Sequence, residues 1–112
     1  MKKLLRLFAL PATLLALSTL ALAVSGWTDY ARVAELIPGT QYRYLVKLQV
    51  AENPSGCKNK DTFYQDYSAT GSNHMFRVLL EAVSSGKDVR VYVTGKCELS
   101  GYAEISSVGI VP

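Results

Sequence analysis

Five stretches of the chain alternate apolar and polar side chains, and this pattern constrains the fold more than any other feature. Alternation with a period of two is typical of β-strands that bury one face. The first stretch slips by one residue before Leu36, which predicts a β-bulge there, and the last slips at Ser106 and Ser107. The predicted strands span residues 27–36, 42–50, 62–67, 88–93 and 102–111.

Helical spacing replaces alternation once, between the third and fourth predicted strands. Apolar residues recur there every three or four positions, at Met75, Phe76, Leu79, Leu80, Ala82 and Val83. We expect a helix from about His74 to Ser85, with Ser72 or Asn73 as its N-cap. Gly86 follows directly after the predicted helix, at the position where a left-handed backbone favours glycine.

The resulting order, β-β-β-α-β-β, is that of the OB-fold, a five-stranded Greek-key barrel. We therefore expect a mainly β OB-fold barrel, with one helix between strands 3 and 4, as a single domain over residues 24–112. Other small sheets with one helix share this order of elements.

Residues 1–23 have the composition of a secretory signal peptide that is cleaved near Val24. Lys2, Lys3 and Arg6 form a basic start, an apolar run follows, and Ala21 and Ala23 are small residues at the positions that signal peptidase reads. The run is short for a membrane span and lacks a basic stop-transfer flank. The protein is expected to be exported, either periplasmic or secreted, with no stable membrane insertion after cleavage.

The three basic residues of that segment account for the whole formal net charge of +3. Residues 24–112 are therefore neutral overall, with basic and acidic residues interleaved. A protein that neutralises several phosphates carries a basic excess. We expect no nucleic-acid partner.

The chain has two cysteines, Cys57 and Cys97. An exported protein meets an oxidising environment, and two cysteines allow only one intramolecular pairing. A Cys57–Cys97 disulfide is predicted, with Cys97 in a loop after the fourth strand. Free thiols or a bridge between molecules are the alternatives.

No catalytic constellation is apparent. His74 is the only histidine and belongs to the predicted helix start, while both cysteines are assigned to the disulfide, so no metal site is expected. Neither a nucleophile elbow nor a phosphate-binding glycine loop occurs. We expect a protein that is not an enzyme and needs no cofactor.

Seven tyrosines and one tryptophan are the distinctive residues. Such side chains suit glycan and protein contacts, because each combines an apolar face with a polar group. The residues expected in the core are Trp27, Tyr44 and Phe63. The residues expected at the surface, as candidate ligand contacts, are Tyr30, Tyr64, Tyr67, Tyr92 and Tyr102. In OB-folds ligands bind along strands 2 and 3 and at the loops joining strands 1–2 and 4–5, which correspond here to residues 38–41 and 95–101.

Two resemblances add to this pattern. The segment from Phe76 to Val93, with its Leu79-Leu80 pair and Ser85-Gly86 exit, resembles the B subunits of subtilase-cytotoxin-type toxins. Residues 24–112 also resemble a group of small exported bacterial proteins of unassigned function. The shared features are Trp27, Gly56-Cys57, the helix exit at 79–89, Cys97, and Gly101-Tyr102 to Ile110.

The toxin resemblance implies an OB-fold subunit that assembles as a pentamer and binds host glycans. The helix would then line a central pore with its polar side, Arg77, Glu81, Ser84 and Ser85. The first functional hypothesis is accordingly an exported, non-enzymatic module that recognises a glycan. The alternative is a monomeric periplasmic accessory factor or inhibitor that binds an envelope or host protein.

Overall fold

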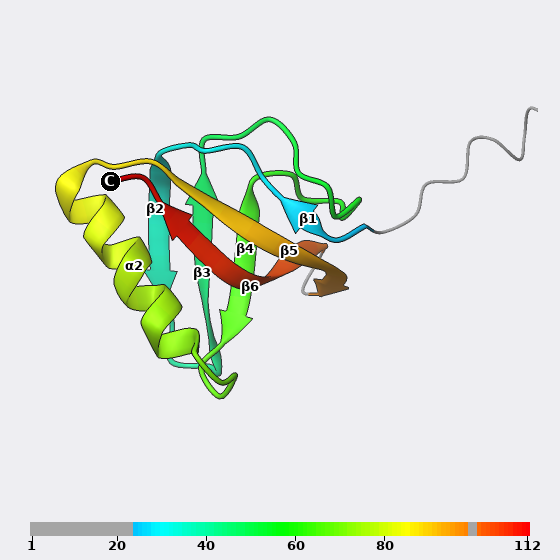
Figure 1. Ribbon diagram of the computed structural model, residues 1–112. Helices are drawn as coiled ribbons and strands as arrows, with labels where there is room; N and C mark the ends of the chain where they lie inside the picture. The colour runs from blue at the N-terminus through cyan, green and yellow to red at the C-terminus, as the bar shows by residue number, and fades with distance from the viewer. Residues whose placement is uncertain (1–23, 99–100) are drawn as a thin grey trace, which may run out of the picture.

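A computed structural model describes residues 24–98 and 101–112 of the chain. The signal peptide predicted at residues 1–23 lies outside the described residues. The fold is mainly β, with six strands in one sheet, one helix and one disulfide (Figure 1). The strands are β1 (Gly26–Trp27), β2 (Val33–Pro38), β3 (Arg43–Leu48), β4 (Thr62–Asp66), β5 (Val89–Glu98) and β6 (Tyr102–Ile110), and the helix is α2 (Ser72–Ser85).

The strands follow the order β1-β5-β6-β4-β3-β2 across the sheet. All neighbouring pairs are antiparallel except β4 and β6, which run parallel. The prediction of a closed, five-stranded barrel is wrong, because the described sheet has six strands and is open.

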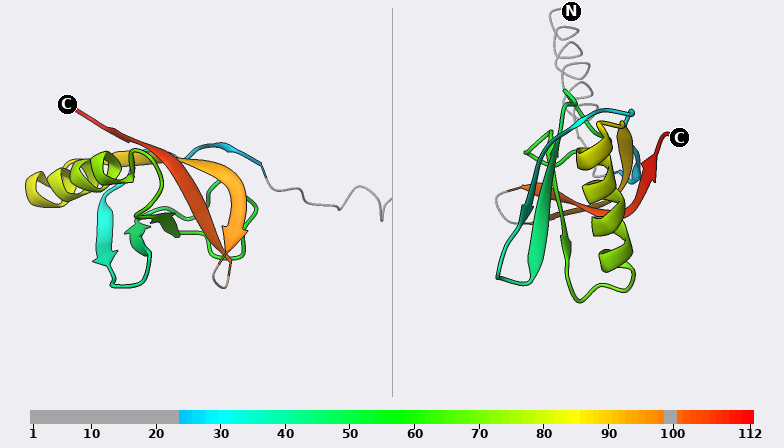
Figure 2. Two further views of the ribbon diagram at one scale, coloured as in Figure 1. Left: turned by 90° about the horizontal axis from the view of Figure 1, so that it is seen from below. Right: turned by 90° about the vertical axis from the view of Figure 1, so that its left-hand side faces the viewer.

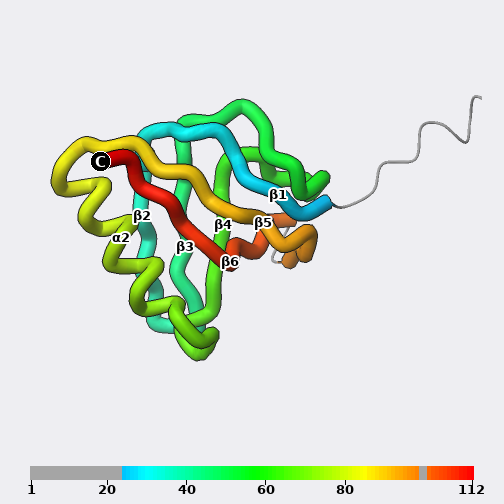
Figure 3. The backbone as a smooth tube through the Cα atoms, viewed as in Figure 1, coloured from blue at the N-terminus to red at the C-terminus, as the bar shows by residue number. Residues whose placement is uncertain are grey.

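The strand predicted at residues 27–36 is in fact two strands, β1 and β2. The chain first runs along β5, where the backbone N–H groups of Ala31 and Val89 each donate to the other's carbonyl at 2.8 Å. It then leaves β5 and pairs with β3, where Val33 lies opposite Leu48 (Figure 3). One strand cannot follow both partners without a break. The predicted bulge is confirmed by a register shift between Val33 and Glu35.

The core lies between α2 and one face of the sheet. Alternation is confirmed in β3 and β5, whose inward residues are all buried; they are Tyr44, Val46, Leu48, Val89, Val91 and Val93. Leu79 and Ala82 of α2 are buried against them, and the ring of Phe76 meets the ring of Tyr44 edge-on at 5.1 Å. Figure 2 shows α2 on one side of the sheet, and no helix within residues 24–98 and 101–112 covers the opposite face of β2, β3 and β4.

The ends of α2 are only partly as predicted. Gly86 is the C-cap at φ 69° and its N–H donates to the Ala82 carbonyl, which confirms the prediction. The predicted N-cap by Ser72 or Asn73 is wrong, since the helix begins at Ser72 and Gly71 is the N-cap. The Ser72 hydroxyl instead donates to the carbonyl of Tyr67 at 3.3 Å.

The predicted Cys57–Cys97 disulfide is present and joins the loop after β3 to β5, across 40 residues of sequence. Cys97 lies within β5, opposite Ala103, and not in a loop as predicted. The strand continues past its expected end because β5 bends between Val93 and Cys97, where the register to β6 shifts. The slip at Ser106 is likewise confirmed, since the register also shifts between Tyr92 and Val93 opposite it.

Candidate functional site

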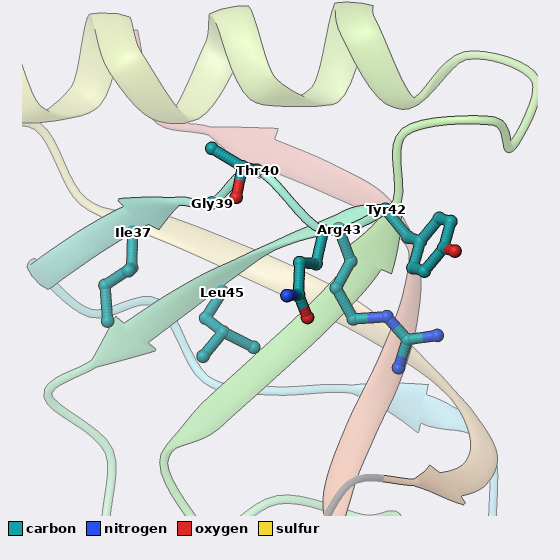
Figure 4. Close-up of a pocket in the computed structure, with 7 residues that line it drawn as sticks. Ile37, Gly39, Thr40, Tyr42, Arg43 and Leu45 are labelled. Atoms are coloured by element: carbon teal, nitrogen blue, oxygen red, sulfur yellow. The ribbon is translucent and has the colours of Figure 1, made fainter.

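A shallow hollow of about 400 Å³ lies on the helix-free face of the β2–β3 hairpin. We call it the hairpin hollow; its lining residues are Ile37, Gly39, Thr40, Gln41, Tyr42, Arg43 and Leu45. Ile37 and Leu45 face each other in the β2–β3 register and form its apolar wall. Figure 4 shows both side chains pointing to the same side of the hairpin, away from α2.

Tyr42 stands at the turn of this hairpin and is 79% exposed. It is the one described non-glycine residue with positive φ, at 66°. Alternation along residues 42–50 puts Tyr42 on the same face as Tyr44, but the left-handed backbone breaks the period of two and turns the Tyr42 ring outward. The conformation costs a side-chain-bearing residue about 1–2 kcal/mol.

Tyr67 holds the turn in this shape. Its backbone N–H donates to the Tyr42 carbonyl, and its hydroxyl donates to the Gly39 carbonyl at 2.7 Å. Two bonds from one residue therefore fix both sides of the turn. Tyr67, predicted as a ligand contact, is exposed and acts here as a support for the turn.

Arg43 connects the hairpin hollow to a charged network on β4, β5 and β6. Its guanidinium lies 4.6 Å from the centre of the Tyr64 ring, with Nε 2.8 Å from Asp66 Oδ1 and Nη1 3.4 Å from Glu98 Oε1. The Arg43 side chain covers the Tyr64 ring, which explains why Tyr64, predicted at the surface, is only 1% exposed. Burial, followed by the charge of Glu104, raises the pKa of Tyr64 to about 12.

Glu98 of this network has a basic neighbour that favours its charged form. Lys96 Nζ lies 3.1 Å from Glu98 Oε2, and this hydrogen bond lowers the pKa of Glu98 and raises that of Lys96. Glu104 accepts a hydrogen bond from the Thr94 hydroxyl at 2.9 Å. An ionised carboxylate accepts hydrogen bonds only, so this face is suited to receiving hydroxyl donors.

A second cluster joins two of the predicted ligand residues on the outer side of β1 and β5. Tyr30, Arg90, Trp27 and Tyr92 follow one another in contact, and we call them the aromatic row. The Arg90 guanidinium lies 4.2 Å from the Trp27 ring centre and 5.1 Å from that of Tyr30, and Tyr92 meets Trp27 edge-on at 5.4 Å.

Trp27 was expected in the core but is 39% exposed. It belongs to a two-residue strand at the end of the strand order, where it pairs with Tyr92, and its ring lies on the outer side of the sheet under Arg90. Tyr102, the remaining candidate, is half-buried on β6 opposite Glu98, away from the row. Alternation places Arg90 and Tyr92 on the outer side of their strand, as observed, but it could not indicate Trp27 or Tyr42 as exposed, because these depend on a break in a strand or on a left-handed turn.

In residues 24–98 and 101–112, no group of three or more histidine, cysteine, aspartate or glutamate side chains is arranged to hold a metal ion. No helix in that part of the chain is long and apolar enough to cross a membrane. His74 lies exposed in the first turn of α2.

Comparison of the chain with protein-family models, with curated proteins and with solved structures finds no match. The resemblance to toxin B subunits and to small exported bacterial proteins stays a prediction.

Proposed function

We propose that this protein is an exported, non-enzymatic binding module that recognises a glycan at the hairpin hollow. The observation that carries the proposal is Tyr42, whose ring is exposed on a left-handed backbone beside a hollow with both apolar and polar walls. Strained residues of this kind concentrate at functional sites. Because the ring is 79% exposed, it makes few contacts within the chain that would offset the strain. We therefore expect the ring to contact a ligand.

The chemistry of the hollow suits a sugar. Ile37 and Leu45 offer an apolar surface, Gln41 offers an amide, and Tyr42 offers an exposed ring at the rim of the hollow. A sugar ring likewise combines an apolar face with a rim of hydroxyl groups. A volume of about 400 Å³ lies at the lower end of the range for small-molecule sites.

Strand pairing supports an OB-like topology for the same proposal. If β1 and β2 are counted as one interrupted strand, residues 26–38 border β5 at one end and β3 at the other. β3 and β4 then take the places of OB strands 2 and 3, and residues 38–41 become the loop that joins strands 1 and 2. Ligands of OB-folds bind at that face and loop.

A glycan array probed with residues 24–112 in the oxidised form tests the proposal. We expect binding that free sugar competes away and that Tyr42→Ala weakens at least about tenfold, the scale of a contact that dominates binding. Tyr30→Ala is the matched control, because it removes an exposed tyrosine from the aromatic row and should leave sugar binding unchanged. Binding that ignores Tyr42→Ala, or the absence of any glycan ligand, would reject the proposal.

Assembly into a ring of five is a separate part of the proposal, which rests on the toxin resemblance. The polar side predicted to line a pore, Arg77, Glu81, Ser84 and Ser85, is exposed on α2, as the ring requires. Light scattering on a sizing column should then give about five times the subunit mass, as expected for a closed cyclic assembly. A measured mass equal to that of one subunit would reject the ring of five, and the hairpin hollow would then be a single site on a monomer.

A further inference from the structure

We propose that the aromatic row is a docking site for a carboxylate on an acidic peptide segment of a partner protein. The hairpin hollow plays no part in this proposal. It starts from Arg90, whose side chain is packed between the rings of Trp27 and Tyr30 at the end of the sheet.

Arg90 lacks the counter-charge that Arg43 and Arg32 have. Arg43 is paired with Asp66 and Glu98, and Arg32 with Asp88. Among the residues that the structure describes, no carboxylate lies within ion-pair distance of Arg90, and its buried Nε has no hydrogen-bond partner. The residue as a whole is half-buried, so its terminal Nη groups, and not the buried Nε, are the donors that a group from outside can reach.

The aromatic rings prepare Arg90 for an anion. Stacking between Trp27 and Tyr30 restricts the rotamers of the side chain before any ligand arrives, so less entropy is lost on binding. Gly109 lies opposite Arg90 on β6 and borders its side chain, and a Cβ at that position would make an ordinary van der Waals contact of 3.4 Å with Arg90 Cγ. A fixed guanidinium fork matches the two oxygens of a carboxylate.

The surroundings favour a peptide over a sugar or a nucleic acid. The Arg90 guanidinium lies over the rings of Trp27 and Tyr30, so these ring faces are not free to stack on a sugar. One cation in a chain that is neutral over residues 24–112 provides little attraction for a polyphosphate. Tryptophan, tyrosine and arginine together are the residues that dominate protein–protein contacts.

The fluorescence of Trp27 gives a direct test, because it is the only tryptophan of the chain. Oxidised protein spanning residues 24–112 is titrated with a capped peptide of alternating glutamate and leucine, and separately with its glutamine–leucine counterpart. We expect saturable change in the Trp27 emission with the glutamate peptide, and binding of the glutamine peptide at least about tenfold weaker, as for loss of a dominant charged contact.

Two substitutions distinguish the effect of the planar guanidinium geometry of Arg90 from the effect of its positive charge. Arg90→Gln should abolish the response, and Arg90→Lys should weaken it about tenfold, because lysine keeps the charge but not the planar fork. Tyr42→Ala should leave it unchanged, which distinguishes failure here from failure of the glycan proposal. Circular dichroism confirms that each variant is folded.

Equal affinity for the two peptides, or an unchanged response in Arg90→Gln, would overturn the proposal. A titration with an oligogalacturonate provides the remaining comparison. Saturable, Arg90-dependent binding of that acidic sugar, with none of the glutamate peptide, would assign the row to anionic glycans and would also overturn it.

Discussion

At the scale of single residues, substitution of Tyr42 is expected to change stability and glycan binding in opposite directions. Its positive φ costs about 1–2 kcal/mol in any residue with a side chain, while glycine adopts the same backbone freely at a smaller entropic cost. We therefore expect Tyr42→Gly to raise the free energy of unfolding by up to about 1 kcal/mol and to abolish glycan binding. Urea denaturation measures the first effect and the glycan array the second.

Tyr42→Ala is the control, since it removes the ring and keeps the strained backbone. Its stability should stay close to that of the parent protein, because the lost ring is largely exposed. A Tyr42→Gly variant that is less stable than Tyr42→Ala would show that the backbone at this position is not strained.

Tyr44 carries a second residue-scale prediction. Its side chain is fully buried, and its hydroxyl has no hydrogen-bond partner among the described residues. Burying an unpaired hydroxyl is unfavourable, so Tyr44→Phe is expected to stabilise the protein by about 1 kcal/mol in urea denaturation. A loss of stability of similar size would show that the hydroxyl is bonded after all.

The same residue makes stability depend on pH. Burial, followed by the charge of Tyr67, raises the pKa of Tyr44 from its ordinary value of 10.0 to about 12. Between these values the unfolded chain has released the proton and the folded protein has kept it, so the free energy of unfolding falls as pH rises. We expect stability to be lost between about pH 10 and pH 12, and the slope to be shallower in Tyr44→Phe. An equal slope in both proteins would contradict this assignment.

Alternation correctly predicts which residues are buried where a strand keeps the same neighbouring strand on each side along its length. Alternation places Tyr44 and Phe63 in the core, and both are buried. It fails at Tyr64 because β4 is covered on both faces, its outer one by Arg43. It also fails at Tyr42, where the backbone turns left-handed, and at Trp27, where the strand is only two residues long.

At the scale of elements, the disulfide ties the loop after β3 to the far part of β5. Closing a loop of 40 residues restricts the unfolded chain and stabilises by about 3–4 kcal/mol on the chain-entropy model. We expect the Cys57→Ala, Cys97→Ala double variant to lose about this amount in urea denaturation. The parent protein should move to the same midpoint when a reductant is added, while a midpoint that ignores the reductant would contradict the role of the bridge.

The sequence predicts most elements, and its errors have one physical origin. β3, β4, β6 and α2 lie within one or two residues of their expected bounds. The divided first strand and the extended β5 were missed because both depend on pairing between distant strands, which local alternation does not contain. The hairpin hollow falls at the predicted loop 38–41, whereas the aromatic row exists only because β1 pairs with β5.

At the scale of the whole molecule, two faces carry the two proposals. The hairpin hollow belongs to β2 and β3, and the aromatic row to β1 and β5, which lie at opposite ends of the strand order. Glycan and peptide could therefore bind the same molecule without sharing a residue. Variants of Tyr42 and of Arg90 should affect one ligand each.

Chemical-shift mapping locates the glycan site residue by residue and so tests recognition at the hairpin hollow. Isotope-labelled, oxidised protein spanning residues 24–112 is titrated with the glycan that binds most strongly on the array. The proposed function predicts that the largest amide shifts fall in residues 37–45, while the indole N–H of Trp27 does not move. Largest shifts at Trp27 and Tyr30, or no shifts at all, would contradict glycan recognition at the hairpin hollow.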